Sequence, residues 1–174
     1  MTKTFVRRLT ALLLIINASM PLFSATAESR RGEKSFGPYV GYVTRNSSAT
    51  AGLSFEYTLS SVVRIAPEIG VIFRNRDLGG LTVDVNTHFP LSFAAGKAAF
   101  YPLAGLNFTS WSLNGIDPVT SDDVTTHRSR FGLNAGAGVE YFCKPSLKLS
   151  VECRYTLMQT YPTAFATAGI SFVF

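Results

Sequence analysis

The chain has 174 residues, of which 47% are hydrophobic, 13% aromatic and only 16% charged. This length predicts one domain, and the charged fraction lies well below the quarter that is usual in soluble domains. The formal net charge of +5 would suit a nucleic-acid-binding protein. Part of that charge, however, lies in a segment that we expect to be removed.

The first 27 residues have the organisation of a secretory signal peptide. Three cations (Lys3, Arg7 and Arg8) precede an apolar run over residues 9–16, and small residues follow at 25–27. The apolar run is too short to span a membrane as a helix, whereas the order of the three parts is typical of a cleaved signal. We therefore predict a signal peptide over 1–27 and a mature domain over 28–174. Without the signal, 13 basic and 11 acidic residues remain, a net charge of +2, so no basic patch favours nucleic acid as a partner.

The mature chain alternates between apolar and polar residues, and a helical period of 3.6 is absent. In the fourth of its segments, for example, Leu81, Val83 and Val85 share one face, and Thr82 and Asp84 share the other. A period of two over about ten residues is typical of a strand that crosses a membrane at a tilt. Eight such strands are predicted, at 36–43, 49–59, 62–74, 81–93, 97–111, 128–142, 147–157 and 164–174.

The connections between these strands alternate in length. Those at 60–61, 94–96 and 144–146 are short, and those at 44–48, 75–80, 112–127 and 158–163 are longer. Short turns on one side and long loops on the other predict an all-β fold, an eight-stranded antiparallel up-and-down transmembrane β-barrel.

Three features favour a membrane barrel with its apolar face outward over a soluble barrel with its apolar face inward. The polar face is rich in glycine, which suits a crowded interior, and its positive and negative charges are nearly balanced. The apolar face carries aromatic residues near both strand ends. Phe131 and Tyr141 are about 33 Å apart along one strand, which a tilt reduces to roughly 25 Å, the height of the apolar band of such barrels.

The segment 164–174 is predicted to be the closing strand. Its alternation ends on Phe172 and Phe174, and this aromatic ending resembles the assembly signal of outer-membrane barrels. We therefore expect a bacterial outer-membrane location, with outer-membrane lipid and the barrel-assembly machinery as partners.

The segments L-A-G-L-N-F (103–108), G-L-N-A-G-A-G-V-E-Y-F (132–142) and E-C-R-Y-T (152–156) are similar to outer-membrane β-barrel proteins common in the Bacteroidota. The whole mature chain resembles the small eight-stranded family of the outer membrane protein A transmembrane domain and outer membrane protein X. The resemblance implies an architecture rather than an activity. No peptidoglycan-binding domain follows 174, so the anchoring role of the larger relatives is not expected.

The charges of the inward face are predicted to form a buried polar network, because eight strands leave room only for side chains. The alternative is a gated path for ions or protons along the same charges. If Arg74, Arg128 and Arg130 are also counted as inward, the positive and negative charges of this face are nearly equal in number. The network is expected to contain Glu56, Arg64, Glu68, Asp84, Glu140, Lys148, Glu152 and Arg154.

No catalytic, cofactor or metal site is predicted. His127 and Ser129 resemble part of a lipid A deacylase site, but Glu140 has the opposite parity and lies about 35 Å away along the strand, too far for a catalytic triad. His88 is interpreted as a polar filler of the lumen. Cys143 and Cys153 are predicted about 20 Å apart on the lipid face, beyond the reach of a disulfide.

The sequence thus indicates a non-enzymatic outer-membrane barrel with a packed polar lumen. We expect it to serve envelope structure or surface interaction through its extracellular loops. Two interpretations of the polar 112–127 loop stay open: a site for an unidentified extracellular ligand, or a loop that is only solvated. The alternatives are a membrane-embedded enzyme, or a narrow transporter, on the same scaffold.

Overall fold

The computed structural model describes residues 30–116, 123–158 and 162–174. The predicted signal peptide at 1–27 lies outside these residues and stays a prediction. Within the described ranges, no helix has the length and apolarity needed to cross a membrane.

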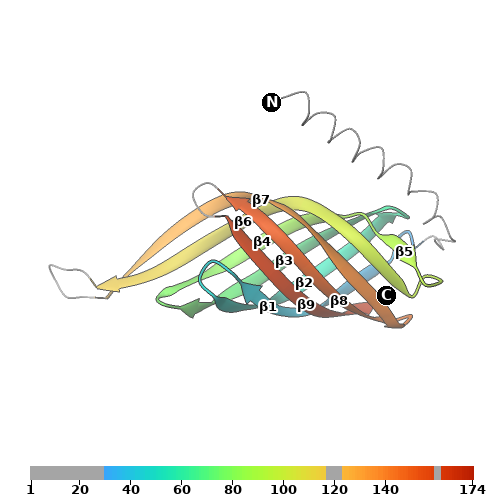
Figure 1. The fold of residues 1–174 in the computed structure, drawn as a ribbon, viewed down its shortest axis with the longest axis horizontal. Coiled ribbons are helices and arrows are strands. Elements are labelled where there is room, and N and C mark those ends of the chain that lie inside the picture. Colours follow the sequence, from blue (N-terminus) through green and yellow to red (C-terminus); the bar gives the residue numbers. More distant parts are fainter. Residues whose placement is uncertain (1–29, 117–122, 159–161) are drawn as a thin grey trace, which may run out of the picture.

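The described chain folds into a closed barrel, which confirms the predicted fold class (Figure 1). Every neighbouring pair of strands is antiparallel, and pairing of β4 with β6 closes the ring. The barrel wall therefore has eight strand positions. The ninth strand, β5, pairs only with β6. The strands are β1 (Lys34–Val43), β2 (Ser48–Ser60), β3 (Val63–Asn75), β4 (Leu78–His88), β5 (Leu91–Phe93), β6 (Ala98–Ile116), β7 (Asp123–Lys144), β8 (Leu147–Met158) and β9 (Thr163–Val173).

The expected strand 81–93 is split into β4 and β5, which together occupy one strand position in the barrel wall, next to β6. The interruption falls at Phe89 and Pro90, because proline has no N–H with which to continue the ladder to β6. The N–H of Phe89 still donates to the carbonyl of Pro102 at 3.0 Å. Pairing with β6 thus resumes in β5 after the break.

Two of the expected long connections are largely strand. The loop predicted at 75–80 is a turn at Arg76 and Asp77, both with positive φ, between the paired residues Asn75 and Leu78. The loop predicted at 112–127 is a ladder paired as far as Ile116 and Asp123. Both segments are polar, so the sequence alternation that marks half-buried strands was absent from them.

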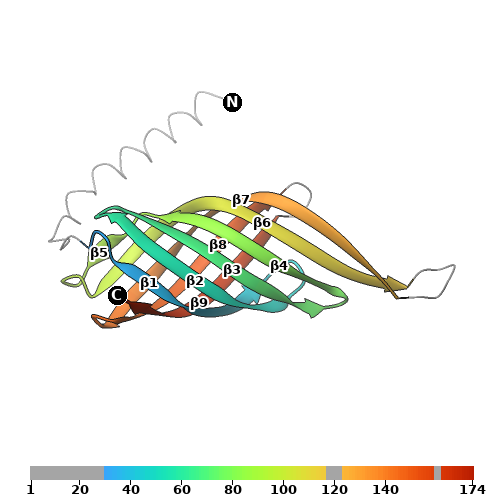
Figure 2. The same cartoon turned by 180° about the vertical axis from the view of Figure 1, so that it is seen from behind.

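The extended β6 and β7 project beyond the rest of the barrel as a two-stranded hairpin, which both side views show (Figures 1 and 2). We call this end of the barrel the hairpin end. The start of β1 and the end of β9 lie at the other end, which we call the terminal end. There Lys34 and Phe174 exchange two backbone hydrogen bonds, of 3.0 and 2.9 Å.

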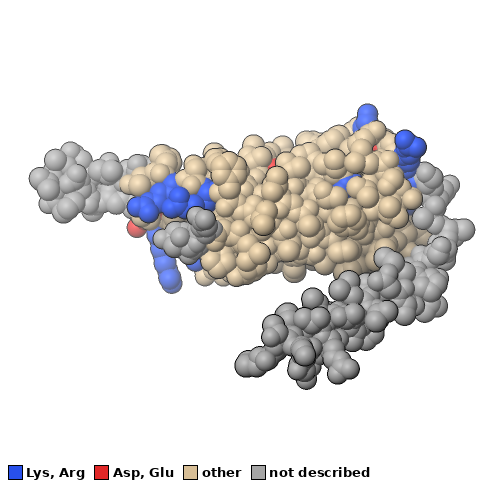
Figure 3. Space-filling view, turned by 90° about the horizontal axis from the view of Figure 1, so that it is seen from above, with Lys and Arg blue, Asp and Glu red and all other residues tan. Residues whose placement is uncertain are grey.

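The apolar face of the strands points outward, as predicted. Leu81, Val83 and Val85 are each about half exposed, whereas Thr82, Asp84 and Asn86 between them are fully buried. Aromatic side chains lie outward near both ends, with Tyr57 and Tyr141 toward the terminal end and Phe73 and Phe131 toward the hairpin end. In the space-filling view, the charged side chains gather at the two ends, with few between them (Figure 3).

Glycines on the inner face make room for large aromatic side chains from nearby strands. Gly138 pairs with Tyr101 across the β6–β7 ladder, and a Cβ at 138 would lie 2.3 Å from Cζ of that ring. Gly52 and Gly70 accommodate Tyr39 in the same way, with Cβ positions 2.5 and 2.3 Å from its hydroxyl oxygen. The lumen is therefore filled by side chains that cross it at the height of glycines, which agrees with the capacity of an eight-stranded barrel.

This packing predicts that Gly138→Val destabilises the barrel by about 1–3 kcal/mol, because the new side chain must displace the buried Tyr101 ring. The measurement is urea unfolding of the protein refolded into lipid vesicles. Ala135→Val is the matched control, since Ala135 lies on the same strand but faces outward and is exposed. Equal unfolding midpoints for the two variants would contradict a close-packed lumen.

Candidate functional site

The eight residues expected to form the lumen network all lie inside the barrel. None is more than 8% exposed, and they come from strands β2, β3, β4, β7 and β8. Because strands distant in the sequence face one another across the lumen, the ion pairs join residues up to 92 positions apart. The structure divides the eight residues into two clusters.

The terminal cluster consists of Glu56, Arg64, Glu140 and Lys148, and it lies toward the terminal end. The Arg64 guanidinium pairs with Glu140 at 2.9 Å and with Glu56 at 3.2 Å. The Lys148 ammonium lies 3.1 Å from Glu140 and also pairs with Glu56. With two acids and two bases, each in contact with both partners of opposite charge, the formal charge of this cluster is zero.

The central cluster consists of Glu68, Asp84, Glu152 and Arg154, near mid-height of the barrel. The Arg154 guanidinium contacts Glu68 at 2.5 Å, Glu152 at 3.2 Å and Asp84 at 3.2 Å. Asp84 also accepts hydrogen bonds of 2.7 Å from the side-chain amides of Asn107 and Asn134. Three acids share a single base, so the central cluster has two formal negative charges in excess.

The near balance of inward charges that the sequence predicted is therefore wrong for the lumen itself. Arg74 and Arg128 are exposed and Arg130 is half-buried, all beyond the packed interior at the hairpin end. Parity alone placed them on the inner face, but parity does not tell how far a strand projects beyond the ring.

His88, Tyr39 and Tyr101 complete the lumen beside the central cluster. His88 is 1% exposed and stacks on Tyr101 with ring centroids 4.5 Å apart. The Tyr101 hydroxyl lies 3.3 Å from a Glu152 oxygen, to which it donates a hydrogen bond. The two tyrosines were not among the predicted site residues; the signal that could have found them is an inward parity opposite glycines of the neighbouring strands.

Both ends of the lumen are closed by side chains. At the terminal end, Arg30 lies 3.7 Å over the Phe142 ring, donates to the Gly96 carbonyl at 2.9 Å and pairs with Glu33 at 3.5 Å. Burial raises the pKa of the Glu33 carboxyl, although Arg30 opposes the shift. At the hairpin end, an apolar plug blocks the interior, formed by Val43, Ile72, Trp111 and Phe165 with Leu78 packed against it.

A groove of about 350 Å³ lies on the outer side of this plug, at the base of the β6–β7 hairpin. Its basic side chains are Arg45, Arg128 and Arg130, and Trp111 forms part of its wall. Arg45 lies 5.6 Å over the Trp111 ring. The Trp111 indole N–H is buried and has no hydrogen-bond partner within the described part of the chain. Figure 3 shows this concentration of basic side chains at the base of the hairpin.

The remaining candidates lie apart from one another. His127 and Ser129 are exposed near the hairpin end, whereas Glu140 and Glu152 are buried in the lumen. The cysteines are free and exposed, and Cys153 pairs with Ala137 as predicted. Phe172 and Phe174 face outward at the terminal end and are 59% and 69% exposed.

The two clusters predict different responses to the loss of one carboxylate. Glu140→Gln leaves two buried cations with one anion, and we expect a loss of about 3–5 kcal/mol of unfolding free energy. Glu152→Gln removes charge from a cluster that already has an excess of it, so its loss should be smaller. Urea unfolding in vesicles at neutral pH, with a chelator present so that no metal ion compensates the charge, measures both. The charge assignment fails if Glu152→Gln then costs as much as Glu140→Gln.

Solved structures of known proteins resemble this barrel in fold. The N-terminal β-barrel domain of Pseudomonas aeruginosa OprF is 16% identical with a TM-score of 0.68, over 83% of this chain and 98% of that one. Neisserial surface protein A is 14% identical with a TM-score of 0.64, over 83% and 97%. Ail, the attachment invasion locus protein of Yersinia pestis, is 14% identical with a TM-score of 0.60, over 83% and 99%. At these identities the likeness shows the fold alone.

No curated protein matches the chain. The family model described as the outer membrane protein beta-barrel domain matches residues 11–174, which is nearly the whole sequence. Together with the outward apolar face, this match establishes the bacterial outer membrane as the location. The chain belongs to the family of outer membrane protein β-barrel domains.

Proposed function

We propose that this barrel is a non-enzymatic surface protein whose hairpin end binds an anionic ligand, a sulfated or phosphorylated sugar. The observation that carries the proposal is the groove of about 350 Å³ at the base of the hairpin. This volume lies within the range of small-molecule sites, which commonly combine apolar walls with a few polar groups.

The chemistry of the groove favours a sulfate or phosphate group. Arg128 and Arg130 are two residues apart on β7, and cross-strand pairing with Trp111 and Thr109 puts both on the inner face of the ladder. Guanidinium groups bind such anions through paired N–H donors. The indole N–H of Trp111, which has no partner within the described part of the chain, is a further donor at the wall of the groove.

A neighbour in fold supports the ligand class. Ail of Yersinia pestis has been solved in complex with the heparin analogue sucrose octasulfate, a polysulfated sugar, in a structure that aligns with this barrel at a TM-score of 0.57. The likeness in sequence is only 14%. The likeness therefore supports only the capacity of such a barrel to hold this ligand class, and the arginines of the groove support the proposal for this chain.

The two alternatives are less well supported. A transporter needs a path through the lumen, but both ends are closed and a cavity beside the central cluster has a volume of only about 20 Å³. A deacylase-like enzyme needs a carboxylate beside His127, but Glu140 and Glu152 are in the lumen. We therefore expect no steady, large conductance in planar bilayers; a stable open channel would favour the transporter.

We further propose, as expected from the sequence, that Phe172 and Phe174 are read by the barrel-assembly machinery. Phe174→Ala should reduce the amount of barrel assembled in the outer membrane of cells more than it reduces the stability of the refolded protein. Phe36→Ala is the control, because Phe36 pairs with Phe172 across β1 and β9 and is also an exposed aromatic at the same end. Similar assembly levels for the two variants would mean that Phe174 only packs against lipid.

The groove predicts that wild-type protein in detergent binds sucrose octasulfate, with an affinity that falls as salt is added. The double variant Arg128→Gln and Arg130→Gln should bind at least about tenfold more weakly, because two charge-assisted hydrogen-bonding groups are lost. Isothermal titration calorimetry measures the affinity.

The matched control is the double variant Lys97→Gln and Lys144→Gln. It removes the same formal charge from exposed residues at the terminal end. Unchanged binding in this control, with a loss in the arginine variant, assigns the ligand to the groove. Equal losses in both would reduce the interaction to net charge, and no loss in the arginine variant would exclude the groove.

A further inference from the structure

The central cluster is short of positive charge. Among the residues that the structure describes, Arg154 is the one cation paired with Glu68, Asp84 and Glu152, and both cations of the neighbouring terminal cluster are already paired. Unpaired negative charge is costly in an interior with little water. A buried formal excess of two charges is relieved either by protonation of carboxylates or by a counter-ion, and one divalent cation would neutralise both charges.

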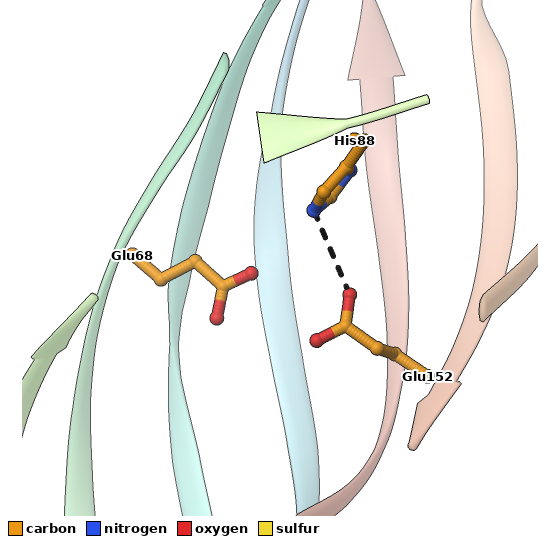
Figure 4. Close-up of side chains that lie close together, drawn as sticks. All are labelled: Glu68, His88 and Glu152. Atoms are coloured by element: carbon orange, nitrogen blue, oxygen red, sulfur yellow. Dashed lines mark ion pairs between the residues drawn. The ribbon is translucent and has the colours of Figure 1, made fainter. Parts of the chain in front are cut away.

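Three side chains beside this excess are arranged as metal ligands. One ligand atom from each of Glu68, His88 and Glu152 lies within 4.8 Å of the others. They come from β3, β4 and β8, and Figure 4 shows them converging on one point in the lumen. Metal bonds of about 2.0–2.2 Å separate neighbouring ligand atoms by roughly 3.4 Å. The ligand atoms of the three side chains thus need to approach one another by at most about 1.4 Å.

Two buried polar groups at this point have no hydrogen-bond partner within the described residues. One is Nε2 of His88, which is 1% exposed and lies 3.8 Å from the nearest Glu152 oxygen, too far for a hydrogen bond. The other is the hydroxyl of Tyr39, which is 7% exposed. Both residues line the same cavity of about 20 Å³, together with Glu68 and Glu152. That volume suits one small occupant.

We propose that the lumen binds one divalent transition-metal ion through Glu68, His88 and Glu152. The ion supplies the missing positive charge and takes up the free Nε2 of His88. A water held by the Tyr39 hydroxyl can complete its coordination. An imidazole with two carboxylates suits zinc, cobalt or manganese rather than magnesium, which prefers six oxygen ligands and dehydrates reluctantly.

The surrounding contacts hold the ligands in place. Arg154 binds Oε2 of Glu68 and Oε1 of Glu152. The second oxygen of Glu68 is left for the ion, and Oε2 of Glu152, which accepts the 3.3 Å hydrogen bond from the Tyr101 hydroxyl, keeps a further lone pair for it. Coordination through Nε2 moves the imidazole proton of His88 to Nδ1, so the long contact of 3.4 Å with Arg64 is lost. Arg64 keeps its pairs with Glu56 and Glu140.

The test uses the protein purified from outer membranes, stripped of metal by unfolding with a chelator and then refolded into detergent micelles with Co²⁺. The visible absorption of Co²⁺ depends on the number and geometry of its ligands, so it identifies the kind of site that holds the ion. We expect one Co²⁺ per barrel, with the absorption of a four- or five-coordinate site, and displacement of that signal by Zn²⁺ but not by Mg²⁺. Refolded wild-type barrel that binds no Co²⁺ overturns the proposal.

Variants locate the ion. His88→Asn and Glu152→Gln should each weaken Co²⁺ binding by more than about 100-fold, beyond the effect of losing an outer-shell partner. The other histidine of the chain, His127, is exposed near the hairpin end, so His127→Asn should bind as wild type does. All variants are compared after heat-modifiable migration on gels has shown that each has folded. Binding that is lost with His127 and kept without His88 would place the metal on the surface and refute the lumen site.

Discussion

The hydrocarbon core of a membrane has no water to bind peptide groups, so every backbone N–H and C=O of a spanning segment must be paired within the protein. Strands meet this requirement only when the sheet closes, and here the pairing of β4 with β6 closes it. Closure at eight strands then fixes the width of the interior. That width is filled by the chain's own side chains, and the polar ones among them must find partners across the lumen.

The charged side chains in the lumen of this barrel are not equally well paired. The terminal cluster is a closed set of two acids and two bases in mutual contact. The central cluster relies on one guanidinium, helped by the amides of Asn107 and Asn134 at Asp84. A buried network in which every polar group has a partner gives rigidity. In a network with unpaired groups, a further partner would be strongly stabilising. The charge excess and the unpartnered His88 and Tyr39 lie together, which is why the centre of the lumen differs from its terminal end.

The two ends of the barrel have different characters. The terminal end is closed by Arg30 over Phe142 and by the backbone pairing of Lys34 with Phe174. The hairpin end is closed by an apolar plug, and its arginines lie outside that plug, where water and ligands can reach them. Because the packed interior is separate from the basic groove, the ligand binding that we propose at the hairpin end would need no change in the lumen.

The sequence by itself determined the architecture, because a half-lipid, half-lumen environment requires alternation and the side-chain period of a strand is two. It thereby assigned Asp84 to the inside and Val83 to the outside, and the glycine-rich face to the lumen. The alternation did not show the split at Pro90, because it continues across this proline and gives no sign of a lost backbone N–H. It also did not show the paired strands at 112–116 and 123–127, because polar strands outside the apolar band carry no alternation. Only the tertiary structure decided which charges meet. Arg154 reaches Glu68 on β3 and Asp84 on β4 because closure brings those strands opposite β8, and such pairings across a lumen leave no periodic trace in the chain.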